Sequence, residues 1–360
     1  MRFSLFAALL ASGVQCQLTR PIDGRDVAES SIRSGSCPPF NRGTFSINAY
    51  QLYPENGDWD AELCQVYFGI LFNASFGISH PYQDRLEVIE FPGITRNPAQ
   101  HIGGVGWDVH SGLVSVLINA GAAFTTTPPD VSGTNIIKKF DPHTKAFLWS
   151  LNITELVTNG TYGGFNDVTA DPRGNTYVVG TFPSSIVRVN KAGTEIFPWY
   201  PPQTSNTSVI GYTGIAWRGD TIIVLDSGAG KLYRFDAAAA KGAPVLVPHY
   251  PPRAIEGGDG IHLPVKIGGK VLLVAEHFKG VSVLRSRSGC WDEAEHLGTV
   301  PNPPGLPEGW LIVSTTQIGE RLNIINDWFA DPWVPGTVAG NKTEFPMIDI
   351  TAQVDQLLAA

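Results

Sequence analysis

A module of two short strands joined by a turn recurs along this sequence, and a third strand follows each clear copy. Three such copies begin at Gly163, Gly211 and Gly257, and an earlier one begins at Gly103. The unit returns roughly every 45 to 50 residues, which is the spacing of β-propeller blades. Because a single blade cannot bury its own apolar faces, the repeat predicts one domain in which the blades pack against one another.

Two weaker copies flank these four, around residues 72–91 and 309–325, and bring the number of blades to six. We therefore predict an all-β fold, a six-bladed β-propeller that covers residues 17–360 as a single domain. A strand near residues 44–52, or one at 345–354, would close the ring and remove its open edge. Residues 352–360 are expected to form a short helix. An ordinary β-sandwich or barrel is the alternative explanation of the same strand pattern.

The chain starts like a secretory signal peptide. Met1 and Arg2 precede a short apolar run, and small residues near Cys16 suggest cleavage before Gln17. We expect residues 1–16 to be removed and the mature protein to enter the secretory pathway, to be secreted or held in a vesicle lumen. No later stretch is long and apolar enough for a membrane span.

Five Asn-X-Ser/Thr sequons follow this start, and behind a signal peptide they predict N-glycosylation on the surface. They stand at Asn73, Asn152, Asn159, Asn206 and Asn341.

Three cysteines remain once Cys16 leaves: Cys37, Cys64 and Cys290. In an oxidising compartment we expect one disulfide and one odd thiol, either buried or able to bridge two chains as a homodimer. The sequence leaves open which two cysteines pair. The net charge of −8, with no run of Lys or Arg, argues against a nucleic-acid partner.

The blade motifs resemble those of the senescence-marker/gluconolactonase superfamily of six-bladed propellers. That resemblance implies a divalent metal held by one Glu and by Asn and Asp ligands near the starts of inner strands. Asn166 and Asp259 match ligand positions, whereas Gly103 stands where we align the Glu and Thr213 replaces an Asn. We therefore expect no metal and no other cofactor. Asn166 and Asp259 can alternatively serve only to satisfy backbone groups at strand ends.

The sequence is also similar to a family of fungal secreted propellers from natural-product clusters, through Gly-Phe-Asn-Asp at residues 164–167 and Gly-Ile-Ala-Trp at 214–217. This family includes hetero-Diels–Alderases of tropolone sesquiterpenoid biosynthesis and the propeller protein of trichothecene clusters. The first type implies loss of water from a hydroxymethyl precursor to give a quinone methide. Cycloaddition to a terpene alkene such as humulene then follows, without a cofactor.

Such chemistry needs an acid or base and an apolar site that holds a small apolar substrate. We predict that His101 or Asp259 transfers the proton and that Asn166 orients a polar group of the substrate. The predicted substrate-binding residues are Phe165, Tyr212, Thr213, Trp310 and His277. Each has a structural alternative, because strand-edge histidines are often only hydrogen-bonded and aromatic residues in blades often pack between sheets.

The sequence hypothesis is a cofactor-independent cyclase of a fungal secondary-metabolite pathway, of the hetero-Diels–Alderase type. One alternative is a trichothecene-cluster propeller that acts on an oxygenated sesquiterpene. The others are a metal-dependent lactonase and a non-catalytic binding propeller. No Gly-X-Ser-X-Gly elbow supports a serine hydrolase.

Overall fold

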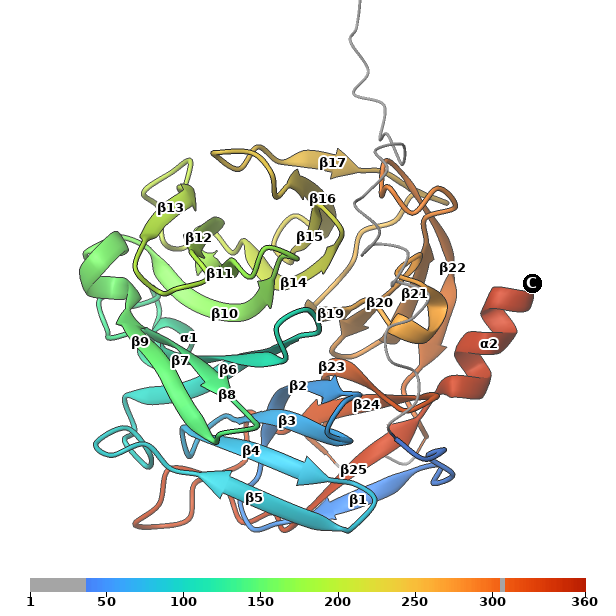
Figure 1. Cartoon of the computed structure of the whole chain (residues 1–360), viewed down its shortest axis with the longest axis horizontal. Helices are drawn as coiled ribbons and strands as arrows, with labels where there is room; N and C mark the ends of the chain where they lie inside the picture. Colours follow the sequence, from blue (N-terminus) through green and yellow to red (C-terminus); the bar gives the residue numbers. More distant parts are fainter. Residues whose placement is uncertain (1–36, 305–307) are drawn as a thin grey trace, which may run out of the picture. The chain divides into compact units, whose positions relative to one another are not determined.

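A computed structural model describes residues 37–304 and 308–360 of the chain. The predicted signal peptide lies outside these residues. The described residues form six antiparallel sheets, each of which is one blade of a propeller, so the predicted all-β, six-bladed fold is confirmed. Figure 1 shows the blades following one another in chain order.

Blades 1 to 4 each contain four strands in chain order. They are β2–β5 (Pro54–Asp60, Gln65–Ile70, Ser75–His80, Arg85–Ile89), β6–β9 (Gln100–Asp108, Leu113–Ala120, Ile136–Asp141, Ala146–Asn152), β10–β13 (Gly163–Ala170, Thr176–Phe182, Ser185–Val189, Ile196–Tyr200) and β14–β17 (Tyr212–Arg218, Thr221–Asp226, Lys231–Asp236, Val245–Val247). Short helical turns lie in their connections: α1 (Ala122–Thr125) and the π-helical η2 (Thr154–Thr158).

Blades 5 and 6 depart from this plan. Blade 5 contains β19–β22 (Gly258–His262, Val271–Glu276, Gly280–Arg285, Ala294–Pro301), a 3-10 turn η3 (Val265–Ile267), and the two-residue strand β18 (His249–Tyr250), which pairs in parallel with β22 at the outer edge. Blade 6 contains β23–β25 (Leu311–Ile318, Arg321–Asp327, Glu344–Asp349) and takes its outer strand, β1 (Phe45–Asn48), from the start of the described chain.

The ring closes through β1 and β25, which lie side by side in Figure 1. They pair in antiparallel register from Phe45 opposite Met347 to Asn48 opposite Glu344. The sequence left two closing segments open, and the structure uses both in one blade. The inner strand β23 also contacts β2, which joins blade 6 to blade 1. The predicted C-terminal helix is present as α2 (Thr351–Ala359).

The apolar core lies between neighbouring blades. Leu117 of blade 2, for example, belongs to one buried cluster with Phe165 and Val178 of blade 3, and the other blade pairs share similar clusters. The inner strands of blades 1 and 2 end on Asp60 and Asp108, and Asp171 directly follows the inner strand of blade 3. Each carboxylate accepts backbone N–H groups of the turn that follows, which stops the strand there.

The two ends of the propeller differ in their connections. Because the strands alternate in direction, the turns from the second to the third strand and from one blade to the next lie where the inner strands begin. We call this end the mouth end. All five sequons lie on or next to these connections, with Asn159, Asn206 and Asn341 exposed and Asn73 and Asn152 half-buried. The amide nitrogen of Asn73 donates to the carbonyl of Gln51. Glycosylation of the five stays a prediction.

Cys37 and Cys64 form a disulfide across 27 residues of sequence. Cys290 is also disulfide-bonded, and the described part of the chain contains no free cysteine. The expectation of one odd thiol refers to a chain without residues 1–16, so it stays a prediction, as does the homodimer. Separately, no helix in the described segments combines the length and apolar character needed to cross a bilayer.

Candidate functional site

Each of the six inner strands carries a β-bulge near the mouth end. The pairing between the first two strands of each blade shifts at this level, and a bulge redirects the side chain of the extra residue. We call the residues that lie at this level the bulge ring: Glu55, Gly103, Asn166, Thr213, Asp259 and Val313. Four of the six carry a polar side chain, so the fold gathers polar groups from four blades around the axis.

Asp259 and His277 form the central pair of this site. Asp259 lies in β19, and His277 lies directly after β20, in the turn at the mouth end. His277 Nε2 lies 2.9 Å from Asp259 Oδ2, and their side chains are 23% and 9% exposed. Burial alone would lower the pKa of His277, but the hydrogen bond and the charge of Asp259 outweigh it and raise that pKa.

Two neighbours complete the hydrogen bonding around Asp259. Asn166 Nδ2 donates to Asp259 Oδ1 at 3.3 Å and to the Thr213 carbonyl at 3.1 Å. The Thr213 hydroxyl donates to the carbonyls of Gly258 and Asp259. The structure therefore brings together four predicted site residues, from blades 3, 4 and 5.

Glu55 also belongs to this site, although the sequence analysis missed it. It lies in β2 at the level of Asn166, is 7% exposed, and its Oε2 atom has no hydrogen-bond partner in the described part of the chain. Burial raises the pKa of Glu55 well above its usual range, and the nearby charges of Asp259, Asp167 and Asp327 raise it further. Glu55 is therefore a buried acid whose surroundings favour its protonated form, beside the Asp259–His277 pair.

Side chains bridge the axis below the bulge ring. Asn56 of blade 1 donates to Asp167 of blade 3 at 2.9 Å, and the ring of His110 in blade 2 lies 5.1 Å from that of Trp217 in blade 4. These contacts join blades that are not neighbours. A ligand would therefore approach the bulge ring from the mouth end.

Asp167 is held firmly in this second layer. Its carboxylate accepts from Asn56 and from the backbone N–H groups of Val168 and Ile215. Burial nevertheless raises its pKa to about 7, because these hydrogen bonds only partly offset the loss of solvent.

The other predicted site residues lie between the blades, away from the bulge ring. Phe165, Tyr212 and Trp310 are 0%, 2% and 6% exposed and belong to the apolar clusters between blades. His101 packs edge-on against Phe72 at 5.6 Å, and burial lowers its pKa to about 4. This placement matches the packing alternative for the three aromatic residues, while their roles remain predictions.

Exposed aromatic side chains flank His277 instead. Phe278 is 77% exposed and Phe329 is 39% exposed, with ring centroids 6.1 Å and 5.9 Å from that of His277. Both lie in turns at the mouth end, in blades 5 and 6. Large apolar side chains that stay exposed next to a polar cluster are typical of a ligand-binding surface.

The divalent metal implied by the superfamily resemblance does not fit the site as it is built. The ring does keep a glutamate, since Glu55 supplies from blade 1 the carboxylate that we sought at Gly103. Both oxygens of Asp259, however, already accept from His277 and Asn166, and the Thr213 hydroxyl points to backbone carbonyls. Residues 37–304 and 308–360 contain no group of three His, Cys, Asp or Glu side chains arranged for a metal ion.

We expect calcium to leave the stability of this protein unchanged. A metal that binds only the folded state raises Tm, and the rise grows with the logarithm of the ratio of its concentration to Kd. Melting in 1 mM EDTA and in 5 mM CaCl₂ should therefore agree within about 1 °C. A rise in Tm that saturates with calcium and disappears in Glu55→Gln would show that these oxygens do form a cation site.

Taken together, the described geometry defines a six-bladed β-propeller with one acid–imidazole–amide cluster at the mouth end. The chain belongs to the family of trichothecene cluster protein 14. It is 32% identical over 352 residues to "Trichothecene biosynthesis protein 14" of Trichoderma arundinaceum, covering 92% of this chain and 94% of the relative. It is also 32% identical to "Core trichothecene cluster (CTC) protein 14" of Fusarium sporotrichioides, covering 90% and 89%. No family model matches the chain.

Solved structures share the fold at low sequence identity. The Malassezia sympodialis allergen Mala s 1 has a TM-score of 0.73 at 17% identity and covers 86% of this chain and 96% of its own. A gluconolactonase from Xanthomonas campestris has a TM-score of 0.52 at 14% identity, with 85% and 89% covered. These likenesses support the propeller fold and carry no statement about activity.

Proposed function

We propose that this protein is an enzyme of a fungal secondary-metabolite pathway, a cyclase that closes a ring on an oxygenated sesquiterpene with loss of water. The names of its two relatives support the pathway and the substrate class. The observation that carries the chemistry is Glu55, a buried acid with a raised pKa next to the Asp259–His277 pair. A carboxyl group whose pKa is raised by burial is a usual form of a general acid.

In the proposed reaction Glu55 donates its proton to a hydroxyl of the substrate as the C–O bond breaks, and water leaves. A second hydroxyl attacks the same electron-deficient carbon system, and its proton passes to His277. A new C–O bond replaces the broken one, so the reaction consumes no oxidant or reductant. Return of the proton from His277 to Glu55, through solvent, restores the starting state.

His277 is suited to the role of base through its tautomer. A proton on Nε2 donates to Asp259 and leaves Nδ1 as the nitrogen that accepts. Asp259 then stabilises the imidazolium that forms, as a carboxylate does in other acid–base groupings. Asn166, which contacts Asp259, holds the carboxylate in place.

The hetero-Diels–Alderase hypothesis shares the first of these steps. Loss of water from a hydroxymethyl tropolone would need the same acid, and an apolar alkene such as humulene would pack on Phe278 and Phe329. The exposed aromatic pair, Phe278 and Phe329, is the observation that supports the hetero-Diels–Alderase as a second candidate function. The two relatives favour the oxygenated sesquiterpene.

The test is to incubate purified protein with hydroxylated sesquiterpenes, and separately with a hydroxymethyl tropolone and humulene, in EDTA. We expect a product 18 Da lighter than the sesquiterpene, formed faster than in buffer. Product only from the tropolone arm would select the second candidate. Binding without product in either arm would leave a non-catalytic propeller, and activity that EDTA abolishes would favour a metal-dependent lactonase.

Truncating the exposed aromatic pair should weaken substrate binding without changing the chemistry. Truncation of Phe278 or Phe329 removes apolar surface that a bound hydrocarbon would cover, so KM should rise by about 10-fold. The kcat and its pH profile should stay unchanged. Leu246→Ala is the matched control, because this exposed side chain lies in the outer strand β17 of blade 4. Unchanged KM in both phenylalanine variants would show that the substrate binds elsewhere.

A further inference from the structure

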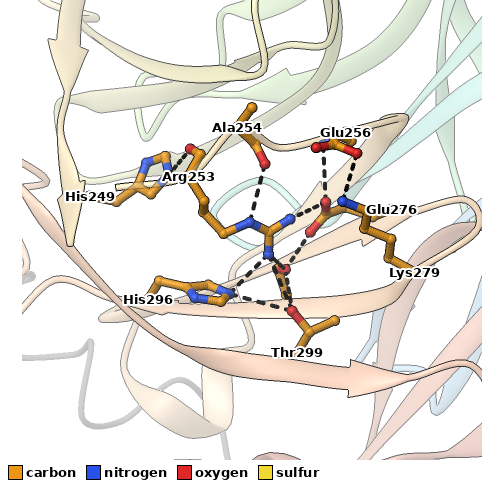
Figure 2. Close-up of polar contacts among 9 residues, drawn as sticks. His249, Arg253, Ala254, Glu256, Glu276, Lys279, His296 and Thr299 are labelled. Atoms are coloured by element: carbon orange, nitrogen blue, oxygen red, sulfur yellow. Dashed lines mark hydrogen bonds and ion pairs between the residues drawn. The ribbon is translucent and has the colours of Figure 1, made fainter. Parts of the chain in front are cut away.

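Blade 5 contains a buried ion pair that the proposed chemistry does not use, between Arg253 and Glu276 (Figure 2). Glu276 ends β20 and its side chain is fully buried, whereas that of Arg253 is 22% exposed. The Glu276 carboxylate accepts from Arg253 Nη2, from the Ser282 hydroxyl and from the backbone N–H of Glu256. Every oxygen of this buried carboxylate is therefore satisfied.

Arg253 reaches this position from an unusual segment. Within the described residues, blade 5 is the only blade with a fifth strand, and the chain runs from that outer strand β18 back to the inner strand β19. Arg253 lies in this crossing. Its Nη1 lies 2.8 Å from Ser282 Oγ, 3.2 Å from Thr299 Oγ1 and 3.1 Å from His296 Nε2. The guanidinium thus fastens the crossing to β21 and β22.

The ion pair is connected to both members of the Asp259–His277 pair. Glu276 directly precedes His277 in the chain. Its carboxylate binds the N–H of Glu256 at 3.0 Å, and the His277 N–H binds the Gly257 carbonyl at 3.0 Å. Both contacts lie within three residues of Asp259. They fix the start of β19 against the end of β20, and Asp259 and His277 extend from those two strand ends.

We infer that Arg253 and Glu276 are positioning residues, which hold Asp259 and His277 at the separation that the acid–base chemistry requires. The positioning of Asp259 and His277 follows from the contacts alone. Only its consequence for turnover rests on the proposed function. A buried ion pair is a poor source of stability, because desolvation offsets the attraction between the charges. A role in fixing the geometry of the neighbouring pair accounts for its presence next to that pair.

The test compares Glu276→Gln and Arg253→Lys with the wild-type protein. Gln keeps the shape of the side chain and removes its charge, and Lys keeps the charge and loses the forked contacts. Since either change can unfold the chain, the double variant Arg253→Met/Glu276→Leu removes both charges and leaves neither unpaired. Lys139→Met is the control, because Lys139 is buried between blades 2 and 3 and contacts Ser115 and Thr176, far along the ring from blade 5.

Two readouts separate positioning from stability. In NMR titrations of labelled histidine, which need no substrate, we expect the pKa of His277 to fall in the folded variants and to stay unchanged in Lys139→Met. In Glu276→Gln and in the double variant, kcat should fall by about 10- to 100-fold while KM is retained. Arg253→Lys keeps the positive charge and should therefore retain part of the turnover that these variants lose. A folded double variant or Glu276→Gln with the wild-type His277 pKa would overturn the inference. An unchanged kcat alongside a shifted pKa would instead count against the proposed function.

Discussion

Replacing Glu55 with Gln is expected to lower kcat by about 10²- to 10⁴-fold, the usual contribution of a positioned acid. Glu55 is the buried acid at the level of the bulge ring, and burial raises its pKa, which favours the protonated carboxyl group. Gln has the same shape but cannot donate a proton of comparable acidity. The measurement is the rate of product formation, with Glu90→Gln as control, because Glu90 is exposed and outside the ring.

The same substitution should leave the fold intact. The raised pKa of Glu55 favours its neutral form in the folded chain, and its Oε2 atom has no hydrogen-bond partner among the described residues. Gln therefore removes neither an ion pair nor an observed hydrogen bond. A folded Glu55→Gln protein with wild-type turnover would remove Glu55 from the chemistry.

The second large effect is a loss of stability as the pH rises from 6.5 to 8. Three buried carboxyl groups have raised pKa values: that of Asp167 is about 7, and those of Glu55 and Asp327 lie well above their usual range. In the unfolded chain all three lose their protons near pH 4. Each group that stays protonated only when folded lowers the free energy of unfolding by about 1.4 kcal/mol per pH unit.

The direction follows from the protons bound in each state. A raised carboxyl pKa stabilises the folded chain fully at low pH, and this contribution fades as the pH rises from about 4 toward the folded pKa. His101 and His262, whose pKa values burial lowers to about 4, act in the opposite direction, but only below their unfolded pKa of about 6.5. These two histidines therefore do not contribute to the loss of stability above pH 6.5.

Urea unfolding at pH 6.5, 7.2 and 8 measures this slope. Glu55→Gln and Asp167→Asn should each make it shallower, and Glu90→Gln should not. Lys139, whose pKa burial lowers to about 8, acts in the opposite direction near pH 8. Stability that is flat or rising between pH 6.5 and 7.2 would therefore mean that these carboxyl groups ionise normally in the folded protein.

The repeat alone was enough to predict the fold, because a blade has its own strand and turn pattern. The sequence did not reveal which segment closes the ring, since β1 and β25 come from opposite ends of the described chain and pair only in the folded structure. The fifth strand of blade 5 was equally invisible, because β18 has only two residues.

Only part of the candidate site was predicted from the sequence, because the prediction depended on how clearly each blade repeats the common pattern. Asn166, Thr213 and Asp259 were found because their blades are clear copies of the repeat. Glu55 was missed because we began the first blade near residue 72, although its strand starts at Pro54. Aligning Pro-Glu-Asn-Gly-Asp-Trp-Asp at residues 54–60 with the other inner strands would have found it. The packing of Phe165 and Tyr212 between blades was not foreseen, because a sequence does not show on which side of a bulge a side chain points.

The protonation state of Glu55 tests the central claim most directly. The carboxyl carbon of Glu55 can be followed by ¹³C NMR in uniformly labelled protein, identified by the resonance that Glu55→Gln removes. We expect a carboxylic-acid chemical shift at neutral pH, where exposed glutamates have lost their protons. A resonance that titrates near pH 4.5, as in an exposed glutamate, would contradict the buried acid on which the proposed function rests.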